Sequence, residues 1–221
     1  MIYWVLYFLN GLANLFFELF DPFHSFFLIS RFLLMPLLFL VWLKNGGLKL
    51  NFGKTISFSL LFSWIGDIIL TFSENGILYF ASGLGAFLLA HIFYIIAFSR
   101  VKSGKKKFSL FELRPWLVWP LVFLFVGLIS QYWKNLGMLK IPVLIYAICI
   151  ITMLAYSINR YSFVNNLSWF FVFLGALLFV ISDSLIGYHK FVVPVNLSRF
   201  WIMLTYILGQ GFIVFGLLKG R

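Results

Sequence analysis

Apolar runs of about 20 residues recur along the whole chain and restrict the folds it can adopt. A run of that length is sufficient to cross the hydrocarbon core of a bilayer as a helix. Because a membrane-spanning segment must satisfy its own backbone hydrogen bonds, we expect an all-α polytopic membrane protein with eight transmembrane helices in one bundle. The predicted spans are residues 2–19, 23–43, 54–73, 76–99, 115–132, 140–157, 168–187 and 198–218.

The composition excludes a soluble globular domain. Of the 221 residues, 63% are hydrophobic and only 10% are charged, whereas soluble proteins are about one quarter charged. The first run lacks a basic leader and a small-residue cleavage site, so we expect it to be retained as a membrane helix. No internal repeat or low-complexity segment is visible, and residues 1–221 are predicted to form a single integral membrane domain.

The basic residues predict the orientation of the chain in the membrane. A formal net charge of +11 would indicate nucleic-acid binding in a soluble protein. Here the positive-inside rule explains the charge, so we expect neither nucleic-acid binding nor an obligate protein partner. With the N-terminus inside, 12 of the 17 Lys and Arg residues lie in inside connections and four lie outside, which predicts that both termini are cytoplasmic. The basic run 102–107 fits a topology anchor better than a lipid-headgroup site.

Two aspartates lie inside apolar runs: Asp67 in the segment SWIGDIIL and Asp183 at the end of GALLFVISD. A carboxylate at membrane depth costs several kcal/mol unless it is paired, protonated or hydrated, so each aspartate is a candidate functional residue. The rise of an α-helix places Asp67 about 9 Å and Asp183 about 6 Å from the predicted outer ends of their helices. The alternative is a structural pair between an aspartate and Arg31.

Other polar residues fall in the same outer layer of the predicted bundle. By the same arithmetic, Arg31 and Tyr206 lie about 12 Å and Tyr146 about 9 Å from the outer ends, with Gly83 and Asn14 at a similar level. We therefore expect several helices to form a shared pocket. The alternatives are a snorkelling arginine, tyrosines of the interface belt and, for Asn14, a helix–helix hydrogen bond.

His91 shares one helix face with Gly83, Phe87 and Tyr94, because these residues follow i+4 and i+3 spacing. Its predicted depth is about 22 Å from the outer end, well below the aspartates. His91 is therefore expected to close the floor of a deep pocket or to bond a neighbouring helix. Gln210, which follows Tyr206 by one turn, is a candidate for the same floor.

The remaining ligand-type residues do not indicate a metal site. His24 and His189 are expected in loops, and one deep histidine does not support a multi-histidine centre. Cys149 lies in an apolar run and is the only cysteine, so it forms no internal disulfide. The sequence has no CxxC or Cys/His cluster, and we expect neither a metal nor another cofactor.

Taken together, these stretches resemble the YhhN-like family, the lysoplasmalogenases of bacterial and animal membranes. The most specific are GD followed by the GxxxFxxxHxxY face, and the later GAxxFxxSD. A lysine is common in the family where this chain has Arg31. The matching residues follow the family order over nearly the whole chain: Arg31 with Pro36, Gly66 with Asp67, Phe80, Gly83, Phe87, His91 and Tyr94, Pro142 with Tyr146, Ser182 with Asp183, and Tyr206 with Gln210.

The resemblance implies an eight-helix hydrolase that cleaves the vinyl-ether bond of lysoplasmalogens into a fatty aldehyde and a glycerophospho-headgroup. The two essential aspartates of the family correspond to Asp67 and Asp183, no metal is expected, and a bacterial inner membrane is the expected location. Gly66, Gly83 and Phe87 are expected to shape the pocket. Substrate contacts are expected at Arg31, His91, Tyr94, Tyr146, Ser182, Tyr206 and Gln210.

The chemistry of vinyl ethers fits two carboxyl groups. Their hydrolysis begins with proton transfer to the outer alkene carbon, and water captures the resulting oxocarbenium ion. Two neighbouring carboxyls in a low dielectric do not both ionise easily, so we hypothesise that Asp67 and Asp183 share a proton as acid and base, which contributes roughly 10²–10⁴-fold. Arg31 is the candidate phosphate contact. The alternative function is a small-molecule or proton-coupled transporter that uses the same polar layer, and a purely structural membrane protein is a third alternative.

Overall fold

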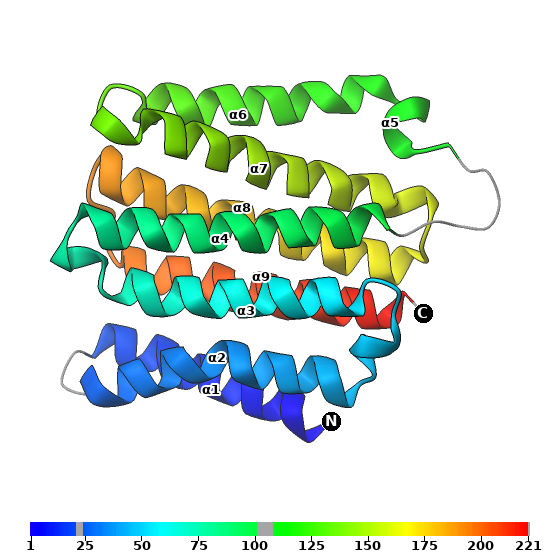
Figure 1. Cartoon of the computed structure of the whole chain (residues 1–221), viewed down its shortest axis with the longest axis horizontal. Coiled ribbons are helices and arrows are strands. Elements are labelled where there is room, and N and C mark those ends of the chain that lie inside the picture. Colours follow the sequence, from blue (N-terminus) through cyan, green and yellow to red (C-terminus); the bar gives the residue numbers. More distant parts are fainter. Residues whose placement is uncertain (21–23, 101–107, 221) are drawn as a thin grey trace.

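The computed structural model describes residues 1–20, 24–100 and 108–220, and helices that run side by side dominate it (Figure 1). Eight of the described helices are long and apolar enough to cross a membrane, so the eight predicted spans are confirmed. They contain α1 Ile2–Leu19, α2 His24–Lys44, α3 Gly53–Thr71, α4 Ile77–Ser99, α6 Val118–Tyr132, α7 Lys140–Asn159, α8 Asn166–Phe191 and α9 Ser198–Lys219. The span of α6 includes the 3-10 turn before it and begins at Pro115. A one-turn helix, α5 Leu110–Leu113, precedes α6.

Most helix ends lie within a few residues of the predicted ones, and the largest difference is at the end of α8. The sequence predicts a break from Tyr188 onward, but the helix continues to Phe191. His189 therefore lies in the last turn of α8 rather than in a loop, and its Nδ1 accepts a hydrogen bond from the backbone N–H of Val195 at 3.0 Å. His24 begins α2. The basic run 102–107 lies outside the described residues.

The connections between spans gather at the two ends of the bundle. Both chain termini lie at one end, together with the connection between α2 and α3 (Figure 1). The other end, which we call the hairpin end, carries the α3–α4, α6–α7 and α8–α9 connections. The cytoplasmic location of the two termini stays a prediction from the distribution of basic residues.

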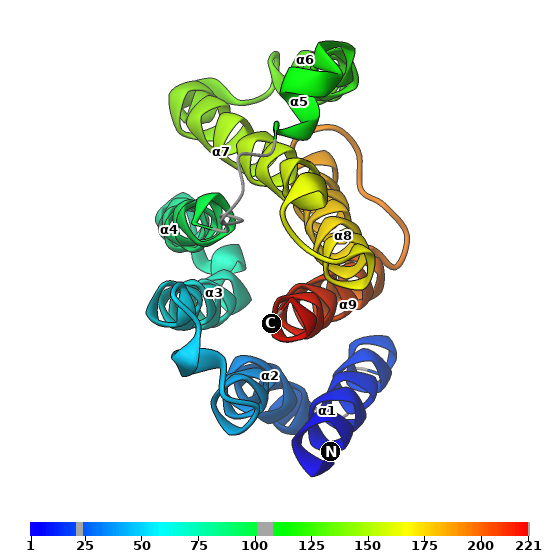
Figure 2. The ribbon, with the colours of Figure 1, turned by 90° about the vertical axis from the view of Figure 1, so that its right-hand side faces the viewer.

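Seen from its end, the bundle places α3 and α4 opposite α8 and α9, with α1 and α2 at one edge and α6 at the other (Figure 2). Two amides of α1 bind α2: Asn10 Nδ2 donates to the Ser30 carbonyl at 2.7 Å, and Asn14 Nδ2 donates to Ser30 Oγ at 3.0 Å. The sequence allowed two interpretations of Asn14, a residue of the shared pocket or a helix–helix hydrogen bond. The structure shows the helix–helix hydrogen bond. Lipid offers no hydrophobic driving force between helices, so such polar contacts help to select their neighbours.

Helices α8 and α9 approach each other closely through glycine. A Cβ added at Gly175 would lie 2.6 Å from the Gly209 carbonyl oxygen and 2.7 Å from the Ile213 backbone nitrogen. A Cβ at Gly216 would lie 2.8 Å from the Val172 nitrogen. Small residues at a helix interface allow this backbone contact. The close packing fixes the relative positions of α8 and α9, each of which carries a candidate site residue.

The packing at Gly175 predicts a strong effect of a single methyl group. Gly175→Ala should destabilise the protein by about 1–3 kcal/mol, because the new Cβ meets backbone atoms that cannot rotate away. Gly127→Ala on α6 is the matched control, since no side chain or neighbouring helix of the described residues comes within 4 Å of its Cβ position. Thermal unfolding of both variants in detergent measures the difference. Equal unfolding temperatures for the two variants would contradict the close α8–α9 packing.

The predicted orientation can be measured by cysteine labelling in a Cys149→Ala background. Met138→Cys at the hairpin end, where Met138 is 92% exposed, should react with a membrane-impermeant maleimide added to intact cells. Asn51→Cys, exposed in the α2–α3 connection, should react only after lysis. The reverse pattern would place the termini outside.

Candidate active site

Asp67 lies on α3 and is buried, with 3% of its surface exposed. Its Oδ2 accepts a hydrogen bond of 2.8 Å from the hydroxyl of Tyr206 on α9. The Tyr206 ring is held edge-on by Phe87 and Phe179, with centroids 5.8 and 5.4 Å away. Asp67 and Tyr206 are 139 positions apart in the sequence. Their contact agrees with the prediction that both lie in one outer layer of the bundle.

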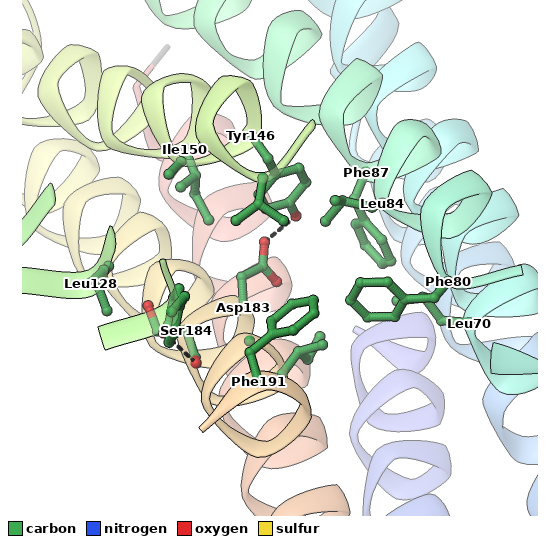
Figure 3. Close-up of a pocket in the computed structure, with 15 residues that line it drawn as sticks. Leu70, Phe80, Leu84, Phe87, Leu128, Tyr146, Ile150, Asp183, Ser184 and Phe191 are labelled. Atoms are coloured by element: carbon green, nitrogen blue, oxygen red, sulfur yellow. Dashed lines mark hydrogen bonds between the residues drawn. The ribbon is translucent and has the colours of Figure 1, made fainter. Parts of the chain in front are cut away.

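Asp183 lies on α8 and has a tyrosine partner of its own. Its Oδ2 accepts a hydrogen bond from the hydroxyl of Tyr146 on α7. Figure 3 shows the carboxylate pointing toward this hydroxyl at the edge of a cavity. Tyr146 and Tyr206 are 8% and 3% exposed, so the alternative of interface-belt tyrosines is wrong for both.

The two carboxyl groups lie within range of each other's charge. Each is on its own helix, and each takes one hydroxyl from a third or fourth helix. Arg31 is within range of the charge of Asp67, but its Nη1 pairs with Glu18 Oε1 at 3.5 Å. Among the described residues, the ion pair of Arg31 is therefore with Glu18, and none joins Arg31 to an aspartate.

His91 lies beside Asp183 rather than below it. Its Nε2 is 3.7 Å from Asp183 Oδ2, and its ring packs edge-on against Tyr146 and Phe179 at 5.3 and 4.7 Å. The distance is longer than a hydrogen bond. In the described part of the chain, neither ring nitrogen of His91 has a hydrogen-bond partner. The imidazole is thus placed to contact Asp183 or a bound molecule.

The predicted difference in depth between His91 and Asp183 is too large because the helix ends are not level. Helix α8 continues four residues past its predicted end, which moves Asp183 about 6 Å deeper. Phe191, the last residue of α8, stacks edge-on against Phe80 at 5.7 Å, within the first turn of α4. The longer α8 and the contact at its end together place Asp183 and His91 at similar depths in the bundle.

Tyr94 and Gln210 belong to a separate buried network. The Tyr94 hydroxyl donates to Gln210 Oε1, and Gln210 Nε2 donates to Ser63 Oγ at 3.0 Å. All three residues are 0% exposed. The network joins α4, α9 and α3, and a substrate contact for Tyr94 or Gln210 stays a prediction. Ser63 was not among the predicted residues, although it lies one turn before Asp67 in SWIGDIIL.

Two further hydroxyls serve helix packing close to the aspartates. Ser182 Oγ donates to the Ile202 carbonyl of α9 at 3.1 Å, so this predicted substrate contact is directed at a neighbouring backbone. Tyr7 of α1 donates to the Ile207 carbonyl at 2.7 Å and is 0% exposed. Sequence reasoning missed Tyr7 because a tyrosine in an apolar run carries no signal of its partner.

Asp183 faces a small apolar cavity of about 60 Å³ between α4, α6, α7 and α8 (Figure 3). Asp183 is the one charged residue among those that line it. The aliphatic and aromatic lining includes Leu70, Phe80, Leu84, Phe87, Leu128, Ile150, Ile186 and Phe191. An apolar space beside a carboxyl group suits the uncharged part of a lipid.

Two glycines bring the walls of this cavity together. A Cβ at Gly66 would lie 2.6 Å from the Phe87 ring, and a Cβ at Gly83 would lie 2.6 Å from Leu70 Cδ2. Phe87 and Leu70 both line the apolar cavity. The pocket-shaping positions predicted from the sequence, Gly66, Gly83 and Phe87, therefore lie at the α3–α4 contact that borders the cavity.

A larger and more polar cavity of about 690 Å³ lies at the hairpin end, and we call it the vestibule. Its charged lining residues are Glu18, Arg31, Glu74, Lys190 and Arg199, which come from α1, α2, the α3–α4 connection, α8 and α9. The vestibule and the apolar cavity share three lining residues, Leu70, Phe80 and Ile186. These shared residues, which we call the partition, separate the polar space from the apolar one. Within the described residues, no three His, Cys, Asp or Glu side chains gather as metal ligands would.

The fold and site define a polytopic helical membrane protein with a buried aspartate pair. The chain belongs to the YhhN family, whose family model matches residues 26–217. Human lysoplasmalogenase TMEM86A is 30% identical over 175 residues, which cover 73% of this chain and 64% of the human protein. Bovine lysoplasmalogenase TMEM86A is 30% identical over 166 residues with the same coverage. The chain thus spans just under two thirds of these relatives, and no solved structure matches it.

The Tyr94–Gln210–Ser63 network predicts a loss of stability when its phenol is removed. Tyr94→Phe should destabilise the protein by about 1–3 kcal/mol, because Gln210 Oε1 loses its donor while it stays buried. Tyr79→Phe on the same helix is the control, because Tyr79 is 47% exposed. Thermal unfolding in detergent measures both. A Tyr94→Phe protein as stable as the control would show that this hydrogen bond does not hold the bundle.

Proposed function

We propose that this protein is a membrane-embedded hydrolase that cleaves the vinyl-ether bond of lysoplasmalogens, releasing a fatty aldehyde and a glycerophospho-headgroup. The observation that carries the proposal is the buried pair of Asp67 and Asp183, each bound by a tyrosine, with Asp183 facing an apolar cavity. Two mammalian relatives that carry the name lysoplasmalogenase support the substrate class.

The proposed reaction begins with a proton from Asp183, because this carboxyl is the one of the pair that lines the cavity. The proton forms a C–H bond at the outer alkene carbon, and the alkene electron pair leaves an oxocarbenium ion at the carbon bound to oxygen. General-acid catalysis of such a step contributes roughly 10²–10⁴-fold. The negative charge of the aspartate pair stabilises the cation as it forms.

Water then completes the reaction. It adds to the oxocarbenium carbon and gives its proton to the Asp183 carboxylate, which returns that carboxyl to its starting state. The hemiacetal formed in this way breaks its bond to the glycerol oxygen, and the oxygen takes up the hydroxyl proton. The products are the aldehyde and the free glycerophospho-headgroup, so atoms and charges balance without an added reductant or oxidant.

The neighbours of Asp183 have positioning roles in this proposal. The Tyr146 hydroxyl holds Oδ2, which leaves the other carboxyl oxygen for the proton transfer. His91 Nε2 lies 3.7 Å from the same Oδ2 and is close enough to follow a movement of the carboxyl group. Tyr206 donates to Oδ2 of Asp67, so the second carboxyl group of the pair is fixed in place.

The proposed dyad predicts the effect of two isosteric substitutions. Asp67→Asn and Asp183→Asn should each lower aldehyde release from a lysoplasmalogen by about 10²-fold or more. The amide at position 183 cannot donate the catalytic proton, and the amide at position 67 removes the negative charge that stabilises the cation. Glu112→Gln is the control, since this exposed carboxylate lies in α5 outside the spans. The assay uses purified protein in detergent, with and without a chelator, and near-normal release by either asparagine variant would overturn the mechanism.

The same preparation separates the hydrolase from a transporter. Intramembrane charged residues also occur in transporters, and that function was the alternative from the sequence. Uptake of a small solute into liposomes without any aldehyde release would favour the transporter. The short connections at both ends support a bacterial cytoplasmic membrane as the proposed location, while the two relatives are mammalian.

A further inference from the structure

The vestibule carries a positive charge that its own residues do not neutralise. Arg199 pairs with Glu74 at the exposed rim, and Arg31 pairs with Glu18 at 3.5 Å. Lys190 forms no ion pair with a described residue, and its Nζ lies 5.3 Å above the ring of Phe80. Five charged lining residues therefore leave one cation in excess, and this cation lies against the partition.

Arg31 retains a hydrogen-bond donor that no described residue uses. Its Nε is buried without a partner, although its Nη1 reaches Glu18. A buried donor without an acceptor is unfavourable, so a ligand that supplies an acceptor there would be stabilised. The planar arginine fork matches the oxygens of a phosphate. Both observations indicate an anionic group in the vestibule.

The spacing along α8 fits a ligand that reaches from the vestibule to Asp183. Ile186 of the partition follows Asp183 by about one turn, and Lys190 follows it by about two turns, or roughly 10 Å. The Lys190 Nζ lies over Phe80, which lines both the vestibule and the apolar cavity that Asp183 faces. In a glycerophospholipid ether, five bonds or roughly 6 Å separate the ether oxygen from the phosphorus.

We propose that the vestibule binds the phosphate of the lipid substrate through Lys190 and Arg31, with the vinyl ether placed across the partition beside Asp183. This inference rests on the proposed function for the nature of the lipid. It assigns a substrate contact to Lys190, and it fixes the direction of the substrate. The headgroup lies at the hairpin end, and the first carbons of the chain enter the apolar cavity.

A binding measurement tests this without relying on catalysis. The probes are a long-chain lysophospholipid with a saturated ether, which has no vinyl group to cleave, and the matching alkylglycerol without phosphate. The wild-type protein should bind the phosphate-bearing probe more tightly. Lys190→Gln should weaken that binding by about tenfold, as expected for a charged hydrogen bond, and should leave alkylglycerol binding within about twofold. Lys190→Arg should restore most of the affinity.

Lys140→Gln is the matched control. Lys140 also lies at the hairpin end, with its Nζ 5.2 Å above the ring of Trp133, but it does not line the vestibule. It should change the affinity for neither probe. An equal loss in the Lys190→Gln and Lys140→Gln proteins, or an equal loss for both probes, would overturn the proposal.

Competition by inorganic phosphate distinguishes a headgroup site from a site for a free anion. If Lys190→Gln abolishes this competition but leaves the affinity for the lysophospholipid unchanged, the vestibule binds a free anion and the headgroup assignment is wrong. Aldehyde release from a lysoplasmalogen is followed in parallel. A wild-type protein that discriminates between the two probes yet releases no aldehyde would refute the proposed function and leave the phosphate site standing.

Discussion

The burial of two carboxyl groups in an apolar bundle is the constraint on which the arrangement of the helices depends. A buried polar group is tolerated when hydrogen bonds replace the water that it has lost. Here one hydroxyl from another helix reaches each carboxyl: Tyr206 of α9 binds Asp67 of α3, and Tyr146 of α7 binds Asp183 of α8. Each bond thus links a pair of helices, and the glycine contact between α8 and α9 brings the two pairs together.

The sequence predicts the spans well because membrane insertion depends on local properties of a segment. Length and apolarity are sufficient to identify a helix that crosses a bilayer. Helical spacing likewise places Gly83, Phe87 and His91 on one face of α4, and the structure directs this face toward the site. The meeting of Asp67 with Tyr206 follows from a shared depth, which also depends on local helix geometry.

The levels of different helices relative to each other depend on tertiary packing, and there the sequence is insufficient. The distance of His91 from Asp183 was overestimated because α8 runs on to Phe191 and packs there against Phe80. The vestibule has the same origin. Lys190 was expected in a connection, but the extra turn of α8 places it in the lining of the vestibule, to which Arg31 also belongs. No local pattern encodes that encounter.

The contrast between two groups of buried polar residues separates scaffold from site. Gln210 accepts a hydrogen bond from Tyr94 and donates one to Ser63, and all three are sealed from any surface, as expected of groups that hold helices together. Asp183 differs because it faces an apolar cavity and lies next to an imidazole without a hydrogen-bond partner in the described residues. A carboxyl needed only for packing gains nothing from facing an apolar cavity. The oxygen that faces the cavity has lost its water without gaining a hydrogen bond in return. The apolar cavity beside Asp183 is explained if a molecule enters it. The apolar cavity and the polar vestibule next to it match the two ends of a lipid.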